Sequence, residues 1–343
     1  MTPESKYYRV AIIGLGQIGF LMDEDPARDL IWSHAEAYAR HSGFQVTAVC
    51  DPDQDRLSAF SDNFRQAHTF TDHRELLETV DVDVVSVCTP NAYHLDVVRA
   101  LARKQSVKAI FCEKPMGLTD ADAEDIVGVC ERNGVVLAVN YMRRWDPVYQ
   151  AVQDLIASGS VGELRTVSAY GATALLTSSS HLIDLMLMFG GEPDWVCGAS
   201  QTDYVRVVHG VEDPGGVGLV RFKGGSFGFL KGVSASPKHY MFELDLLFTE
   251  GRIVVAEDGR SLSVYRFEDT DTPTGSSYKS LQPLPGLGPL PTGERMLNAL
   301  DDIISCLETG GSPQSNGTSA MLVRKLITCL RESDSMGCQP VII

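Results

Sequence analysis

The sequence predicts an α/β protein in two parts: an N-terminal doubly wound parallel sheet, and a C-terminal α+β domain with an open, mainly antiparallel sheet. Before about residue 145, short apolar runs alternate with helical patterns, as parallel strands and their crossover helices do. Beyond that point, strand patterns follow one another with few helices between them, which is typical of antiparallel sheets. The length of 343 residues also fits two domains, which we place at residues 1–140 and 141–343.

The apolar runs of the first part are short, rich in Val and Ile and almost continuously apolar, as strands covered on both faces must be. They occupy residues 9–13, 44–50, 82–88, 108–112 and 135–140. Helices are expected between them at 33–41, 95–104 and 120–133, and Ser33 and Glu36 form a capping box at the start of the first.

In the second part, helices are expected at 147–158, 181–189, 294–308 and 318–333. Strands are expected at 164–170, 195–201, 205–209, 217–222, 227–233, 242–249, 252–256 and 261–266. Residues 270–292 are rich in Pro, Gly, Ser and Thr, and this composition predicts an extended loop, either an arm across a subunit interface or a lid.

The composition excludes several classes of protein. The chain has 29 Lys and Arg against 45 Asp and Glu, a formal net charge of −16, which argues against nucleic-acid binding and against docking on an anionic membrane. It has neither a signal-peptide pattern at residues 1–9 nor an apolar run long enough to span a membrane. The eight cysteines form no C-x-x-C pair, and no residues have metal-ligand spacing. We therefore expect free thiols, a cytoplasmic location and no metal.

A glycine-rich turn directly follows the first predicted strand and is expected to open a helix. Gly14 permits a tight turn, Gly16 lets the backbone approach a pyrophosphate, and Gly19 allows close packing of helix on strand. Gln17 and Ile18 lie between these glycines and complete this part of the expected cofactor site. The alternative interpretation is a glycine turn in an α/β domain that binds no ligand.

Asp51 ends the second predicted strand, where a carboxylate accepts hydrogen bonds from the adenosine ribose and favours NAD over NADP. The alternative is an ordinary solvated carboxylate. The spacing from Gly19 to Asp51 exceeds the usual ~20 residues, and residues 21–32 look like an insertion. We interpret the acidic stretch 23–25 as a solvated loop near the site, and His34 as a surface histidine.

Two further motifs follow parallel strands at the same edge of the sheet, C-T-P-N at residues 88–91 and C-E-K-P at residues 112–115. With the glycine turn, they resemble the glucose–fructose oxidoreductase/inositol dehydrogenase (Gfo/Idh/MocA) family. The resemblance continues through residues 140–147, the H-L-I-D motif at 181–184 and the last helix. It implies a nicotinamide-binding Rossmann domain, a substrate domain, and hydride exchange between NAD(P) and a sugar or cyclitol hydroxyl.

The resemblance also implies roles for individual residues. Lys114 manages the hydroxyl proton or is the immediate partner of the group that does, and its pKa is expected to be lowered toward neutrality beside cationic NAD⁺. His181 lies near the reacting hydroxyl, and Asp184, on the same helix face, binds another hydroxyl. The serines at 178–180 are candidate caps of that helix. The alternatives are structural roles: a surface lysine, a helix-terminal histidine and a carboxylate with no substrate contact.

This chain departs from the family pattern at Thr177, because many relatives carry an aspartate four residues before the histidine. Threonine can donate and accept a hydrogen bond but cannot act as a carboxylate base. Lys114 and His181 would then handle the proton, with Thr177 only orienting it. Otherwise the substrate or reaction direction differs from the inositol dehydrogenase type, or activity has been lost.

The remaining candidates have structural alternatives as turn, cap or salt-bridge residues. An arginine near the substrate could grip a carboxylate or phosphate, whereas we interpret the polar residues 238–240 as part of a loop. The other expected cofactor-binding residues are Thr89, Pro90, Asn91, His94, Glu113, Lys114 and Asn140, and the expected substrate-binding residues beside Thr177 and Asp184 are Tyr141, Arg143 and Arg144.

The leading hypothesis is an NAD-dependent oxidoreductase that acts on a sugar, nucleotide sugar or cyclitol, in the metabolism of surface-polysaccharide sugars; NADP is the less favoured cofactor. Two alternatives stay open: a glycosidase of the same fold that retains NAD, and a non-catalytic regulator that binds the dinucleotide or a sugar.

The antiparallel sheet would expose an apolar face. Relatives cover that face with another subunit, so we expect a homodimer or homotetramer.

Overall fold

The computed structural model describes residues 7–24, 30–208, 211–236, 238–270, 278–284, 290 and 293–343. The chain forms two compact units, one of Met1–Asp146 with Gly293–Arg324 and one of Pro147–Thr292 with Lys325–Ile343. The sequence-based boundary after residue 140 placed 293–324 in the second domain, whereas this segment packs with the first unit. The reason is the apolar face of helix α8 (Arg295–Thr309), whose Met296, Leu300 and Ile303 are buried in the first unit's core.

The first unit is built on a parallel sheet with the strand order β3-β2-β1-β4-β5-β6, as the doubly wound pattern predicts. The order reverses between β1 and β4, and ligands of such sheets bind at the carboxyl ends of the strands beside this reversal. The strands are β1 (Tyr8–Ile13), β2 (Phe44–Cys50), β3 (His68–Phe70), β4 (Val84–Val87), β5 (Ala109–Cys112) and β6 (Val136–Val139).

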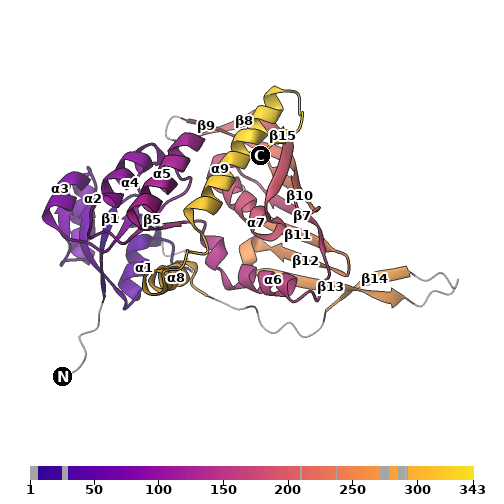
Figure 1. Cartoon of the computed structure of the whole chain (residues 1–343), viewed down its shortest axis with the longest axis horizontal. Coiled ribbons are helices and arrows are strands. Elements are labelled where there is room, and N and C mark those ends of the chain that lie inside the picture. Colours follow the sequence, from indigo (N-terminus) through magenta and orange to yellow (C-terminus); the bar gives the residue numbers. More distant parts are fainter. Residues whose placement is uncertain are drawn as a thin grey trace, which may run out of the picture. The chain divides into compact units, whose positions relative to one another are not determined.

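Helices pack on both faces of this sheet (Figure 1), with α4 and α5 neighbours on one face and α1 beside α8 on the other. Three elements, β3, α2 and α3, were not expected from the sequence. The other helices lie within a few residues of their expected bounds. The helices before residue 147 are α1 (His34–Arg40), α2 (Gln54–Asn63), α3 (His73–Thr79), α4 (His94–Ala102) and α5 (Asp120–Asn133).

The expectation that the glycine turn directly opens a full helix is wrong. The turn continues into a short 3₁₀ helix (Leu21–Glu24), and α1 begins only at His34. The backbone N–H of His34 nevertheless donates to Ile18 O at 3.0 Å, and that of Ala35 donates to Gly19 O at 3.1 Å. The insertion therefore interrupts the helix after its first turn, and α1 resumes on the carbonyls that this turn leaves available. Residues 25–29 of the insertion lie outside the described residues.

The second unit is built on a mixed, mainly antiparallel sheet with the order β14-β13-β12-β11-β7-β10-β9-β8-β15. Only the β10–β7 pair is parallel among its described pairs. The strands are β7 (Leu164–Gly171), β8 (Pro193–Val208), β9 (Val211–Phe222), β10 (Phe227–Gly232), β11 (Phe242–Phe248), β12 (Gly251–Ala256), β13 (Ser261–Thr270), β14 (Tyr278–Pro283) and β15 (Val341–Ile342).

Two sequence expectations about this sheet are corrected. The strands expected at 195–201 and 205–209 form one strand, β8, which pairs with β9 across a register shift; residue 209 itself lies outside the described residues. The extended loop expected at 270–292 contains β14, which pairs with β13 through backbone hydrogen bonds. Residues 271–277, 285–289 and 291–292 of that loop lie outside the described part of the chain.

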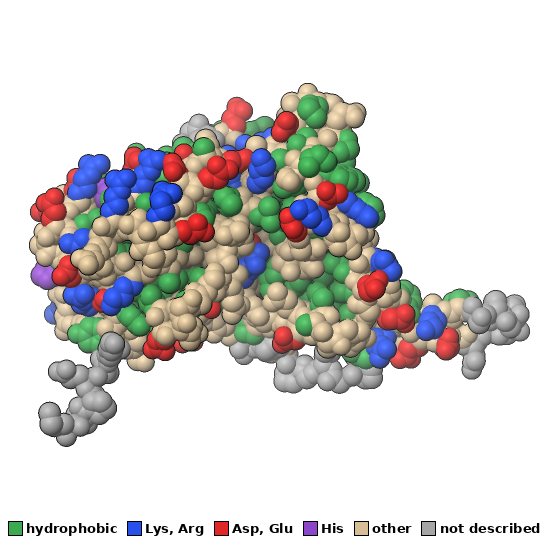
Figure 2. All heavy atoms as spheres, in the orientation of Figure 1, with side chains coloured by type: hydrophobic (Ala, Val, Ile, Leu, Met, Phe, Trp, Pro, Cys, Tyr) green, Lys and Arg blue, Asp and Glu red, His purple; other side chains and the backbone are tan. Residues whose placement is uncertain are grey.

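Helix α7 (Ser180–Gly190) packs against β7 and β10, and most of its side chains are buried. The unit also contains α6 (Pro147–Ala157), while α9 (Gly317–Ser335) runs across the division between the units. On the other face of the sheet, Val217, Phe229 and Leu247 are exposed. Figure 2 shows acidic and basic side chains interspersed on the visible face of the described molecule.

Candidate active site

The glycine turn has both close packing and open space. Gly14 has a φ of +97°, and a Cβ there would lie 2.6 Å from the backbone of Cys88. A Cβ on Gly19 would lie 2.0 Å from Gly14 O, whereas a Cβ on Gly16 would meet no described atom within 4 Å. The turn is therefore closed toward the sheet and open at Gly16, where a dinucleotide's pyrophosphate would approach.

Asp51 is buried at the end of β2, so it is not the solvated carboxylate of the alternative interpretation. Its Oδ2 accepts a hydrogen bond from Leu15 N at 2.7 Å, and its Oδ1 accepts one from Asp53 N at 2.9 Å. The Nη1 atom of Arg56 lies 3.4 Å from Oδ2. The Asp51 carboxylate is thus hydrogen-bonded to the glycine turn, and the Arg56 guanidinium lies beside this carboxylate.

The loop after β4 carries Thr89, Pro90 and Asn91, with His94 as the first residue of α4. His94 is buried, and its Nε2 donates to Thr89 O at 2.8 Å. Burial lowers the pKa of His94, so the ring is neutral and ties the loop to the helix. Thr89 Oγ1 is buried without a hydrogen-bond partner among the described residues.

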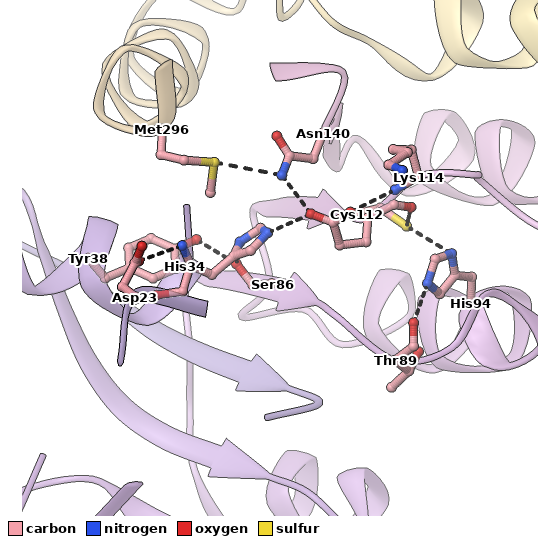
Figure 3. Close-up of polar contacts among 12 residues, drawn as sticks. Asp23, His34, Tyr38, Ser86, Thr89, His94, Cys112, Lys114, Asn140 and Met296 are labelled. Carbon is pink, nitrogen blue, oxygen red and sulfur yellow. Dashed lines mark hydrogen bonds and ion pairs between the residues drawn. The ribbon is translucent and has the colours of Figure 1, made fainter. Parts of the chain in front are cut away.

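The Glu113 carboxylate, directly after β5, is the centre of a buried polar network. Figure 3 labels the neighbours His34, Lys114 and Asn140. Glu113 Oε1 accepts from Asn140 Nδ2 at 2.6 Å and from His34 Nε2 at 3.1 Å, and its Oε2 accepts from Lys114 N at 3.2 Å. Burial by itself would raise the pKa of Glu113. The hydrogen bonds from His34 and Asn140 and the positive charge of Lys114 outweigh that effect and lower it.

The interpretation of His34 as a surface histidine is wrong, because its side chain is fully buried. Its Nδ1 lies 2.8 Å from Ser86 Oγ, which in turn lies 2.9 Å from the Tyr38 hydroxyl. Sequence reasoning did not find His34, Ser86 or Tyr38 as members of the site. The signal that was present is the position of His34 on the otherwise apolar face of α1, whose other buried residues are Ala35, Ala37 and Tyr38.

The structure places the remaining expected residues of the first unit after β6. Asn140 is buried, and its Oδ1 has no hydrogen-bond partner within the described structure. Tyr141 and Arg143 are buried, whereas Arg144 is half-buried and its Nη1 donates to Gln314 O at 3.4 Å. These three lie at a 3₁₀ turn, Met142–Trp145, which Trp145 anchors by donating from Nε1 to Asp302 Oδ2 at 2.8 Å.

In the second unit, Thr177 lies in a π-helical turn, Leu175–Ser179, that leads into α7 with His181 and Asp184. Both of these α7 residues are buried. Asp213, from β9, caps the turn: its Oδ1 accepts from Leu176 N at 2.8 Å and its Oδ2 from Thr177 N at 3.0 Å.

The expectation that residues 178–180 cap the helix is therefore wrong, because a distant strand supplies the capping carboxylate. Ser179 makes no capping bond, and Ser180 Oγ donates to Thr177 O. Sequence reasoning also missed Asp213, which lies within a strand that was expected to begin only at residue 217.

A polar pocket lies beside this capped turn, wholly within the second unit. It contains the cationic side chain of Arg206 and, from the expected polar loop 238–240, His239 and Tyr240. Ser178, Gln201 and Asp213 also line it. Gln201 is fixed in place because Ser234 N donates to its Oε1 and its Nε2 donates to Ser234 O.

No group of three or more His, Cys, Asp or Glu side chains among the described residues is arranged to hold a metal ion. No helix within the described ranges is long and apolar enough to cross a membrane.

Comparison with known proteins identifies the relatives of the chain. A family model for Gfo/Idh/MocA, the oxidoreductase family with an NAD-binding Rossmann fold, matches residues 8–141. The inositol 2-dehydrogenase of Salmonella typhimurium is 32% identical over 45% of this chain and 43% of its own length. The myo-inositol 2-dehydrogenase of Thermotoga maritima is 25% identical over 79% of this chain and 81% of its own length. The match thus spans less than half of the length of several curated relatives.

Solved structures agree on the fold. The WlbA dehydrogenase from Bordetella pertussis, solved with NADH and UDP-GlcNAcA, has a TM-score of 0.79 at 20% identity, covering 98% of this chain and 99% of that one. The sheet order and the glycine turn define a Rossmann fold. The family model places this fold in the NAD-binding oxidoreductase class. Within that class, residues 8–141 belong to the Gfo/Idh/MocA family of oxidoreductases.

Proposed function

We propose that the protein exchanges a hydride between NAD and a hydroxyl-bearing carbon of a sugar, nucleotide sugar or cyclitol. The observation that carries the proposal is the position of Lys114, which follows Glu113 at the carboxyl edge of the Rossmann sheet, the edge that also bears the glycine turn. The membership of the family and the dehydrogenases among its relatives support the reaction class.

The residues of the first unit fit NAD on structural grounds. Gly16 leaves space beside the turn, and Asp51 is held at the end of β2, where a ribose is recognised. Thr89 Oγ1 and Asn140 Oδ1 are buried polar atoms for which the described residues supply no partner. Gln17, Ile18, Pro90, Asn91 and His94 complete the proposed cofactor site. Asp51 also favours NAD over NADP, because its charge disfavours a 2′-phosphate.

When bound, NAD supplies the two-electron acceptor for a hydride. Oxidation of a secondary alcohol also releases the hydroxyl proton, and the neutral amine of Lys114 is proposed to accept it. His181 is proposed to assist this transfer, and Asp184 to accept a hydrogen bond from a further hydroxyl. In the opposite direction the same groups return the proton to the carbonyl oxygen.

The second unit supports a hydroxyl-rich substrate. The polar pocket beside Thr177 contains donors and acceptors that suit several hydroxyl groups, and Arg206 supplies a positive charge for a carboxylate or phosphate. Tyr141, Arg143 and Arg144 are the proposed contacts from the first unit. The proposed substrates include a nucleotide sugar of surface-polysaccharide metabolism, since such a molecule combines hydroxyl groups with phosphates.

We further propose a homodimer or homotetramer that covers the exposed apolar side chains Val217, Phe229 and Leu247 of the second unit's sheet. Analytical ultracentrifugation of the wild type and of Phe229→Lys tests this assembly. A lower oligomeric state in the variant supports the proposed interface, and a monomeric wild type contradicts it.

The reaction is tested by calorimetric titration with NAD(H) and NADP(H), followed by absorbance at 340 nm with a panel of sugars, cyclitols and nucleotide sugars. Lys114→Ala should bind NADH and lose turnover, whereas Lys104→Ala, which removes a lysine whose charge pairs with Asp81 away from the site, should behave as wild type. Failure to bind any dinucleotide would contradict the proposal. Release of a free sugar without added NAD would instead identify the NAD-retaining glycosidase.

A further inference from the structure

The buried contact between His34 and Glu113 is used by no step of the proposed reaction. His34 is the first residue of α1, and its fully buried ring reaches the carboxyl edge of the parallel sheet. There its Nε2 lies 3.1 Å from Oε1 of Glu113. The other oxygen of this carboxylate accepts the backbone N–H of Lys114, so one carboxylate joins α1 to the lysine.

We propose that His34 is a positioning residue, which fixes the Glu113 carboxylate and thereby sets the amine of Lys114 for proton transfer. The inference rests on the proposed function, in which Lys114 handles the hydroxyl proton. His34 acts through Glu113 and does not itself contact the substrate.

The hydrogen-bond network assigns the protons of His34. Ionised Glu113 can only accept, so the ring donates from Nε2. With a neutral ring, Tyr38 donates to Ser86, and Ser86 donates to Nδ1, so that every hydroxyl proton has an acceptor. A doubly protonated ring would leave one of these two buried hydroxyl protons without an acceptor among the described residues. The neutral tautomer protonated at Nε2 therefore fits the site.

The network ends at Tyr38, which is buried. Burial raises the pKa of its hydroxyl above the ordinary value, so this hydroxyl stays protonated and can serve as the donor to Ser86.

The other titratable side chains around Glu113 are uncharged. Burial raises the pKa of the Cys88 and Cys112 thiols and lowers the pKa of His94. Lys114 is thus the neighbouring amine whose protonation the Glu113 carboxylate influences. If the Glu113 carboxylate lost its donor from His34, its lone pairs would turn toward the Lys114 amine. The carboxylate would then favour the protonated, charged form of Lys114.

The interrupted helix explains how His34 reaches this place. Its backbone N–H continues the hydrogen bonding of the glycine turn by donating to Ile18 O. On the insertion side, the Asp23 carboxylate accepts from Trp32 N at 2.9 Å and from Ser33 N at 2.7 Å. The start of α1 is therefore fixed from both sides, and the ring of its first residue is fixed with it.

A matched pair of variants tests the proposal. The amide nitrogen of Gln in His34→Gln reaches the position of Nε2 and keeps a donor to Glu113, whereas the shorter Asn in His34→Asn reaches only the position of Nδ1. His34→Asn should lose about tenfold or more in kcat with less than about a twofold change in KM or in the Kd of NADH, and His34→Gln should keep kcat within about threefold. The exposed His68, in His68→Asn, is the control.

A second readout needs no substrate. Lysine amines carrying ¹³C-methyl groups are titrated by NMR, and the Lys114 signal is identified by its loss in Lys114→Arg. The midpoint should rise by about one pH unit in His34→Asn and match the wild type in His34→Gln. Equal midpoints in both variants, or equal losses of kcat at equal thermal stability, would overturn the proposal. A shifted midpoint in a protein that turns over no substrate would leave the positioning role intact and contradict the proposed function.

Discussion

Gly14 and Gly19 are in such close contact that a Cβ on Gly19 would lie 2.0 Å from the carbonyl oxygen of Gly14. The two glycines close the turn that follows β1, and the backbone of Gly14 itself packs against Cys88. Gly16, between them, has no described atom within 4 Å of a Cβ. One motif therefore combines glycines that the packing of the turn requires with a glycine whose space is left open.

The first prediction separates these two roles. Gly19→Ala should lower the free energy of unfolding by about 2 kcal/mol or more, because backbone has to move to accept the new methyl group. Gly16→Ala should leave stability within about 0.5 kcal/mol of wild type and weaken NADH binding about tenfold. Urea unfolding and fluorescence titration with NADH measure both effects. Unchanged NADH affinity in Gly16→Ala would show that no ligand approaches the turn.

The second prediction concerns cofactor choice at Asp51. Its buried carboxylate accepts the backbone N–H of Leu15, and Arg56 lies beside it. Asp51→Ser should weaken NADH binding about tenfold and raise the ratio of NADPH to NADH affinity, because Arg56 is then released toward a 2′-phosphate. Dissociation constants for both dinucleotides measure the change.

The control for this prediction is Asp55→Asn. It removes an exposed carboxylate from the first turn of α2, the helix that also carries Arg56. It should leave both dissociation constants unchanged. A similar gain in NADPH binding in Asp55→Asn would mean that net charge, rather than the position of Asp51, selects the cofactor.

The sequence predicted those elements of the fold whose own side chains carry a pattern. The almost continuously apolar run at 44–50 and the helical pattern at 120–133 match β2 and α5 in both bounds. By contrast, β3 has only three residues, of which two are exposed, and β14 has no buried residue. These strands form because a neighbouring strand offers backbone partners, which the sequence of the strand itself does not encode.

In the candidate site, too, local motifs could be predicted from the sequence and contacts between distant residues could not. The glycine turn and the E-K-P segment are local motifs, and the structure places both at the expected edge of the sheet. The burial of His34 depends on Ser86 and Glu113, which are 52 and 79 residues away in the sequence. Similarly, Asp213 reaches Thr177 from 36 residues away. Such contacts depend on sheet order and register, so local sequence patterns could not predict them.

The third prediction concerns that contact of Asp213. Its buried carboxylate accepts the N–H groups of Leu176 and Thr177, and its removal leaves both donors without that acceptor. Asp213→Ala should lower the melting temperature by about 5 °C and reduce kcat/KM about tenfold or more, because Thr177 and His181 lose their fixed position. Asp213→Asn, which keeps an acceptor oxygen, should show smaller decreases in melting temperature and in kcat/KM. Calorimetry and initial rates measure the two effects, and unchanged kcat/KM in a destabilised Asp213→Ala would limit Asp213 to a structural role.

The last prediction concerns pH and stability at Asp83, before β4 at the amino edge of the parallel sheet. Its carboxylate accepts from Arg9 N and Arg9 Nε, both at 3.0 Å, and from Lys108 Nζ at 2.8 Å. Burial alone would raise the pKa of Asp83, but these hydrogen bonds and charges lower it from 3.8 to about 2. Because the folded-state pKa is the lower one, the ionised carboxylate contributes about 2 kcal/mol of stability above roughly pH 4, and this contribution is lost as the pH falls toward 2.

Asp83→Asn should therefore be less stable than the wild type by about 2 kcal/mol at pH 7, and the difference should disappear near pH 2. Denaturant unfolding of both proteins at pH 7, 4 and 2.5 measures it. NADH affinity should not change, since Asp83 lies at the opposite end of the strands from the glycine turn. The exposed Asp81, which lies 3.6 Å from Lys104, offers the matched control Asp81→Asn, with an expected difference below about 0.5 kcal/mol at every pH. A difference for Asp83→Asn that persists undiminished at pH 2.5 would show that the loss comes from packing rather than from the charge of the carboxylate.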